Sequence, residues 1–256
     1  MLTDLVDGAV ADARARAAEL PLGSVIDAAA QAAPALDAVS ALAPAAGVKI
    51  IAEVKRASPS RGRLADIPDP AALATVYQQA GASAISVLTE QRKFLGSLDD
   101  LRAVRAAVTI PVLRKDFIAE PYQIYEARAA GADIVLLIVA ALDQPTLVAL
   151  HSLATSLGMT VLVETHSAEE IARALDAGAA VVGVNARNLS TFELDRDLFG
   201  ELADGIPSGV IRVAESAVLS AADVAHYREA GADVVLVGEA LVTSDPIATL
   251  SEFLSV

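Results

Sequence analysis

The 256-residue chain contains no cysteine, only three histidines, and far fewer basic than acidic residues. Without cysteine it can form neither disulfides nor a thiolate site for a metal. The histidines, His151, His166 and His226, are scattered along the chain and do not form a ligand cluster. We therefore expect no metal and no cofactor.

The formal net charge is −14, which argues against a nucleic-acid partner because phosphate backbones are bound by basic surfaces. No apolar run approaches the roughly 20 residues of a membrane span. Asp4, Asp7 and Asp12 do not suit a secretory signal. We expect a cytoplasmic protein without a membrane partner, in which any anionic ligand is held by a local site.

What the chain does contain is a repeat. Ala-Gly-Ala tripeptides at 80–82, 130–132, 177–179 and 230–232 each follow a helix-like segment and precede an apolar run of strand length. Glycine suits the end of a helix because it enters the left-handed conformation without steric cost. The repeats lie about two strand-plus-helix units apart, and apolar runs at 48–53, 110–114, 159–164 and 210–214 supply the intervening strands.

About eight alternating units over residues 48–256 predict a closed (β/α)8 TIM barrel. The alternative is a doubly wound open sheet, which would more often have a glycine-rich turn after its first strand, where this chain has Arg56-Ala57-Ser58-Pro59. Residues 1–47 are rich in alanine, with apolar residues at helical spacing interrupted by proline and glycine. They predict an N-terminal extension of about three short helices.

In a TIM barrel, the active site lies at the carboxyl ends of the strands. We expect the polar residues at 114–116 and 164–166 to converge on this mouth with Glu53 and Lys55, which share one face of the first strand. Counting by two along the later strands gives further inward-facing residues, namely Lys115, Glu164, Asn185 and Glu215. Three carboxylates and two lysines in one low-dielectric cup indicate acid–base chemistry rather than structural ion pairs.

The loops after the last two strands of many such barrels hold a phosphate through backbone N–H groups. Here these positions are occupied by Ser216, Ala217, Gly238 and Glu239. They predict a phosphorylated small-molecule substrate. Four apolar residues near the same mouth suit core or rim packing as well as a ring-binding pocket, namely Phe94, Phe117, Leu136 and Leu189.

Five segments resemble motifs of the indole-3-glycerol phosphate synthase family: IAEVKRASPS at 51–60, VLRKDF at 112–117, LVE at 162–164, GVNARNL at 183–189 and AES at 214–216. The likeness runs from the N-terminal helices to the final helix. It implies a tryptophan-pathway lyase that closes the indole ring of 1-(2-carboxyphenylamino)-1-deoxyribulose 5-phosphate with loss of CO2 and water. We expect a monomer or weak homodimer.

The resemblance also implies roles for individual residues. Lys115 would protonate the ribulose carbonyl, Glu164 would remove a proton during dehydration, and Glu53 would orient Lys115. Asn185 and Glu215 would hold the sugar hydroxyls and the lysine network. The anionic ends of the substrate would meet Lys55, Ser58, Arg187 and Ser216, and its anthranilate ring would be enclosed by Phe94, Phe117, Leu136 and Leu189.

The chain departs from the family at Ala217, where glycine is usual, and at Ala240, where glycine or serine is frequent; a methyl group at either position would crowd the phosphate. Three other activities stay open: a sugar-phosphate isomerase, a Schiff-base aldolase that uses Lys115, and a non-catalytic barrel that binds a phosphorylated ligand. The resemblance places the N-terminal extension over the catalytic mouth, with a cap on the opposite end of the barrel as the alternative.

Overall fold

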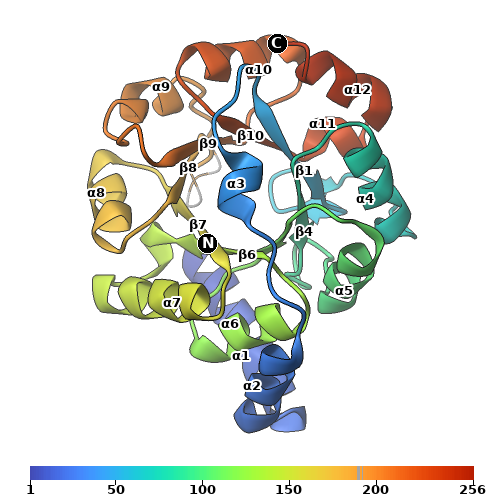
Figure 1. The fold of residues 1–256 in the computed structure, drawn as a ribbon, viewed down its shortest axis with the longest axis vertical. Helices are drawn as coiled ribbons and strands as arrows, with labels where there is room; N and C mark the ends of the chain where they lie inside the picture. The colour runs from blue at the N-terminus through green and yellow to red at the C-terminus, as the bar shows by residue number, and fades with distance from the viewer. Residues whose placement is uncertain (189–190, 192) are drawn as a thin grey trace.

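Eight parallel strands close into a barrel in the computed structural model, which describes residues 1–188, 191 and 193–256 (Figure 1). The barrel strands are β1 (Lys49–Val54), β4 (Ala84–Leu88), β5 (Val112–Lys115), β6 (Ile134–Ile138), β7 (Thr160–Thr165), β8 (Val181–Asn185), β9 (Ile211–Glu215) and β10 (Val234–Val237). They follow one another in chain order, and β10 pairs with β1 to close the ring. The predicted TIM barrel is confirmed, and the open sheet is excluded.

Helices surround the barrel on the outside (Figure 1). They are α4 (Pro70–Gln79), α5 (Leu98–Ala107), α6 (Pro121–Ala129), η1 (Val139–Ala141), α7 (Gln144–Ser156), α8 (Ala168–Asp176), α9 (Leu198–Ala203), α10 (Ala221–Glu229), α11 (Glu239–Val242) and α12 (Pro246–Phe253). A short hairpin of β2 (Ala57–Ser58) and β3 (Gly62–Arg63) follows β1. Within the described parts of the chain, no helix is both long and apolar enough to cross a membrane.

Four strands begin one or two residues later than their apolar runs predicted, because regular pairing with both neighbours starts after the run does. At β5, Pro111 precedes the strand and has no N–H to donate to a ladder. The glycines of the four tripeptides follow α4, α6, α8 and α10 with φ between 90° and 100°. This left-handed backbone confirms the predicted helix ends.

Side chains along each strand alternate between the barrel interior and the helix layer. On β1, Ile50 and Ala52 pack among the helices, while Ile51 packs inside the barrel with residues of the other strands. On β1, β5, β7 and β9, the inward positions next to the mouth are taken by charged residues. The fold therefore places apolar packing at the base of the interior and polar chemistry at its carboxyl end.

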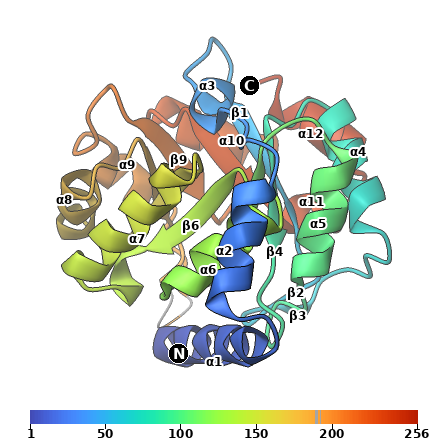
Figure 2. The same cartoon turned by 60° about the horizontal axis from the view of Figure 1, so that its bottom comes forward.

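The N-terminal extension reaches both ends of the barrel (Figure 2). It consists of α1 (Leu2–Glu19), α2 (Leu22–Gln31) and α3 (Ala38–Leu42). Helix α1 lies over the mouth, where Leu5 lines the pocket, and α2 packs along α6. Helix α3 lies at the opposite end, where Leu42 packs into the base of the interior. A position over the mouth and a position at the opposite end were expected as alternatives, and the extension occupies both.

Candidate active site

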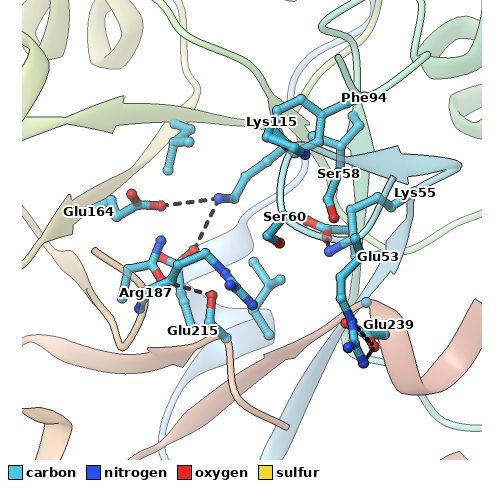
Figure 3. Close-up of a pocket in the computed structure, with 18 of the residues that line it drawn as sticks. Glu53, Lys55, Ser58, Ser60, Phe94, Lys115, Glu164, Arg187, Glu215 and Glu239 are labelled. Atoms are coloured by element: carbon cyan, nitrogen blue, oxygen red, sulfur yellow. Dashed lines mark hydrogen bonds and ion pairs between the residues drawn. The ribbon is translucent and has the colours of Figure 1, made fainter. Parts of the chain in front are cut away.

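A cavity of about 630 Å³ opens at the carboxyl ends of the strands. Nearly all residues expected at the mouth line it (Figure 3), namely Glu53, Lys55, Ser58, Phe94, Lys115, Phe117, Leu136, Glu164, Asn185, Arg187, Glu215, Ser216, Ala217, Gly238 and Glu239. Of the others, Leu189 lies outside the described residues, and Arg114, Thr165 and His166 do not line the cavity. Strand ends that are far apart in the sequence thus build one pocket.

Four charged residues form one layer across the floor of this cavity. Glu53, Lys115, Glu164 and Glu215 come from the alternate strands β1, β5, β7 and β9, as expected for a layer of side chains inside a TIM barrel. The Nζ atom of Lys115 lies 3.1 Å from Oε2 of Glu164 and 3.2 Å from Oε2 of Glu215. The lysine is therefore held between two carboxylates that face the cavity (Figure 3).

Glu53 links this layer to the second lysine. Its Oε1 atom lies 2.7 Å from Nζ of Lys55, and its Oε2 atom accepts a hydrogen bond from Ser86 at 3.1 Å. Burial alone would raise the pKa of Glu53, but the charges of Lys55 and Lys115 lower it below its ordinary value. Glu53 is therefore ionised, and its negative charge stabilises the ammonium groups of both lysines.

The environment moves the pKa values of the other groups apart. Burial opposes the charge of Lys115, yet the surrounding carboxylates raise its pKa above the ordinary value. Burial, together with repulsion from Glu164, raises the pKa of Glu215 to about 8, whereas Lys115 and His166 lower that of Glu164 despite its burial. At neutral pH the layer therefore combines a protonated lysine, an ionised Glu164 and a mostly protonated Glu215. Carboxylates whose pKa values diverge in this way are suited to different acid and base roles.

An apolar wall stands beside the charged layer. The rings of Phe94 and Phe117 lie 6.0 Å apart at 42°, and Leu136 lies on the same cavity. Leu5 of α1 completes this wall. The resemblance placed the N-terminal extension over the mouth, but which of its residues reaches the cavity depends on how α1 docks. A flat aromatic group fits between such a wall and the charged floor.

The opposite side of the cavity is polar. Oδ1 of Asn185 accepts hydrogen bonds from the Ser216 hydroxyl at 2.8 Å and from the Arg187 backbone N–H at 3.0 Å. Ser216 and Ala217 both have left-handed backbone, with φ of 70° and 55°. For a residue with a Cβ this conformation costs about 1–2 kcal/mol, which explains why glycine would suit position 217 better.

Gly238 and Glu239 also lie on this polar side, and each makes a contact that the sequence did not predict. A Cβ on Gly238 would lie 2.6 Å from Oε1 of Glu53 and 2.8 Å from Nζ of Lys55, so the missing side chain makes room for that ion pair. The carboxylate of Glu239 is bound by Arg61, with Nε at 2.9 Å and Nη2 at 2.5 Å. This pairing offsets a negative charge that would repel an anionic ligand.

Arg61 and Ser60 also line the cavity and were not expected there. Ser60 is the last residue of the segment Ser58-Pro59-Ser60 after β1, and Arg61 follows it directly. The motif that indicated Ser58 could therefore have indicated both. Leu194 and Leu219 form an exposed apolar rim, and no sequence signal marked them.

Three expectations for the mouth are wrong, because Arg114, Thr165 and His166 do not line the cavity. The Thr165 hydroxyl instead donates to the backbone oxygen of Gly183. The side chain of Arg114 points out of the barrel and is fully buried, where it pairs with Asp116 at 2.9 Å and Glu126 at 3.0 Å. Asp116 borders the cavity, but its carboxylate accepts from Arg114 and from the Thr89 hydroxyl. Because side chains alternate along β5, an inward Lys115 requires an outward Arg114.

A (β/α)8 barrel with a buried lysine between carboxylates of divergent pKa defines an enzyme of the acid–base class. The family model described as indole-3-glycerol phosphate synthase matches residues 2–253. The chain is 70% identical over 253 residues to the indole-3-glycerol phosphate synthase of Leifsonia xyli subsp. xyli, covering 99% of this chain and 97% of that one. It is 59% identical to that of Rhodococcus jostii over 256 residues, covering 100% and 95%. The chain belongs to the indole-3-glycerol phosphate synthase family.

Solved structures of other proteins share the fold alone. The thiamine phosphate pyrophosphorylase from Pyrococcus furiosus has a TM-score of 0.59 at 14% identity, with 80% of this chain and 93% of that chain covered. The N-acetylmannosamine-6-phosphate 2-epimerase from Clostridium perfringens has a TM-score of 0.61 at 13% identity, covering 76% and 88%.

Proposed function

We propose that the chain converts 1-(2-carboxyphenylamino)-1-deoxyribulose 5-phosphate to indole-3-glycerol phosphate, with release of CO2 and water, as a lyase of tryptophan biosynthesis. The observation that carries this function is the position of Lys115, between Glu164 and Glu215 on the floor of a cavity with an aromatic wall on one side and a polar side opposite. The substrate has the same arrangement: an aromatic ring, a carbonyl in the middle and a phosphate at the far end.

Ring closure begins when the ring carbon that bears the carboxylate attacks the ribulose carbonyl. Lys115 donates a proton to the carbonyl oxygen, for which its raised pKa keeps it charged. Loss of CO2 then leaves a hydroxyl, which takes up a proton and departs as water, while Glu164 removes the proton that the substrate loses in this dehydration. Because Glu164 is ionised and lies beside Lys115, acid and base act from one side of the substrate.

The other site residues position the substrate. Glu53 orients the two lysines, while Asn185 and Glu215 hold the sugar hydroxyls and Lys115. The phosphate and carboxylate are held by Lys55, Ser58, Arg187 and Ser216, with backbone groups of Ala217, Gly238 and Glu239. Phe94, Phe117 and Leu136 enclose the anthranilate ring, together with Leu189, whose side chain lies outside the described residues.

The Schiff-base alternative fits the site less well. A Schiff base requires the neutral amine of Lys115, and the surrounding carboxylates favour the ammonium form by raising its pKa. The remaining parts of the proposal rest on the sequence: residues 1–47 and 48–256 act as one structural domain, in a cytoplasmic monomer or weak homodimer.

The proposed function is tested by incubating the protein with the carboxyphenylamino substrate and following indole fluorescence. We expect fluorescence to rise in proportion to enzyme concentration, with CO2 released in equal amount. Absence of turnover would contradict the proposal, and a borohydride-trapped adduct on Lys115 would favour the aldolase.

The phosphate site predicts that inorganic phosphate inhibits competitively and raises the melting temperature, because a ligand bound only by the native state stabilises it. We expect Ala217→Gly to strengthen both effects, since glycine adopts the φ of 55° freely and removes the methyl group beside the anion. Melting curves are recorded with sodium chloride at matched ionic strength as the control. Equal curves in phosphate and chloride would count against the site.

The position of α1 predicts that this helix retains the substrate. Deleting residues 2–19 removes the lid but keeps α3 at the base of the barrel, so we expect the KM to rise at least about tenfold, equivalent to about 1.4 kcal/mol. Leu5→Ala should raise KM less, and Leu20→Ala, at an exposed side chain, serves as its matched control. An unchanged KM in the truncated protein would refute the lid function even if its melting temperature fell.

A further inference from the structure

The two carboxylate oxygens of Glu164 have different surroundings. Oε2 contacts the Nζ atom of Lys115 at 3.1 Å. Oε1 is buried and has no hydrogen-bond partner among the described residues, but the Nε2 atom of His166 lies 3.8 Å away, within reach of an ion pair. An ionised oxygen in so buried a place requires a compensating positive group.

His166 is held in place from its other side. Its Nδ1 atom lies 3.3 Å from Oε2 of Glu170, and the same oxygen accepts the His166 backbone N–H at 2.7 Å. Glu170 stands in the first turn of α8, and its own N–H donates to the Ser167 side chain that caps this helix. The ring is therefore fixed by the start of α8, behind Glu164 and outside the cavity lining.

The charges around the ring favour its protonated form. Burial opposes protonation, but Glu170 on α8 and Glu164 on β7 raise the pKa of His166 above its ordinary value. Glu215 on β9 also faces the ring and contributes least, since it is mostly protonated at neutral pH. Lys115 of β5 is the other positive charge in contact with that carboxylate among the described residues, and Asn185 of β8 and Glu215 of β9 face it as well. With Nδ1 beside Glu170, Nε2 of the protonated ring lies 3.8 Å from Oε1 of Glu164, a charge contact and not a hydrogen bond.

We propose that His166 is a positioning residue for the base Glu164: anchored on Glu170, it holds Oε1 from behind and leaves Oε2 for Lys115 and the substrate. This inference rests on the proposed function, because it assigns His166 to the base of that reaction. A positive charge beside Oε1 favours the carboxylate, so Glu164 stays ionised and able to accept a proton at lower pH than it would alone.

The kinetic test is the pH dependence of kcat/KM in the wild type and in His166→Gln, Glu170→Gln and His226→Gln. We expect the acid limb of His166→Gln to move up by about one pH unit, with about tenfold loss of kcat/KM on that limb and little change on the plateau. Glu170→Gln should move it in the same direction by less. His226→Gln, at an exposed ring on α10, should match the wild type.

A direct titration makes the test independent of turnover. In NMR spectra, the signal of His166 is the one lost in His166→Gln, and its midpoint should lie above about 6.5, the ordinary value. We expect that midpoint to fall in Glu164→Gln, because removing one charge of a coupled pair disfavours the other.

The outcomes separate this inference from the proposed function. An unmoved acid limb in His166→Gln, or a fall in rate that is equal at every pH and accompanied by a lower melting temperature, would overturn the positioning role. An unchanged His166 midpoint in Glu164→Gln would overturn it as well. Absence of indole formation by the wild type would instead contradict the proposed function, while the NMR coupling would still report on the contact between His166 and Glu164.

Discussion

Replacing Lys115 with alanine is expected to lower kcat by at least about a hundredfold, the usual scale for losing a positioned acid. Lys115 is the charged donor on the cavity floor, and its Nζ atom touches both Glu164 and Glu215. Without it, the carbonyl oxygen has no proton donor at this position as the aromatic carbon attacks. The measurement is indole formation under saturating substrate.

The same substitution removes the positive charge that Glu53, Glu164 and Glu215 share. Because these buried carboxyl groups then lack a compensating cation, we expect a lower melting temperature as well. Circular dichroism at the assay temperature must therefore establish that the variant is folded. Lys93→Ala, at an exposed lysine, is the matched control and should retain wild-type turnover. A folded Lys115→Ala variant with near-normal kcat would remove Lys115 from the mechanism.

Glu164→Gln is expected to lower kcat by a similar factor, at least about a hundredfold, with a smaller effect on KM. Glutamine retains the shape of the side chain and can still accept from Lys115, but it cannot take up a proton at neutral pH. The effect should therefore fall on turnover rather than on substrate binding. Separate determination of kcat and KM distinguishes the two.

This variant should remain stable, because it removes one of three buried carboxylates without removing their cation. Glu252→Gln, on the exposed face of α12, is the control for a change from glutamate to glutamine. If Glu164→Gln turns over at the wild-type rate, the base lies elsewhere, and Glu215 becomes the next candidate because it contacts the same lysine.

Some features follow from the sequence alone because they depend on local periodicity. Alternation along a strand has a period of two, so an inward Leu113 or Leu162 sets the direction of Lys115 or Glu164 two residues later. The Ala-Gly-Ala tripeptides set the helix ends in the same local way, through the left-handed conformation of glycine. The barrel, its order of elements and the inward charges could therefore be predicted without coordinates.

Other features depend on contacts between segments distant in sequence, and only the tertiary structure decided them. Closure of the barrel brings Lys115 between Glu164 and Glu215. Burial and repulsion from Glu164 then raise the pKa of Glu215 to about 8, although the charge of Lys115 opposes this shift. Gly183 is a further example, since a Cβ there would lie 2.2 Å from Oε1 of Glu215 on the neighbouring strand. The docking of α1 over the mouth and α3 at the base depends likewise on surfaces that form only when the barrel has closed. Periodicity gives the direction of a side chain, whereas its neighbours, and therefore its pKa and its chemistry, are set by the packing of the whole chain.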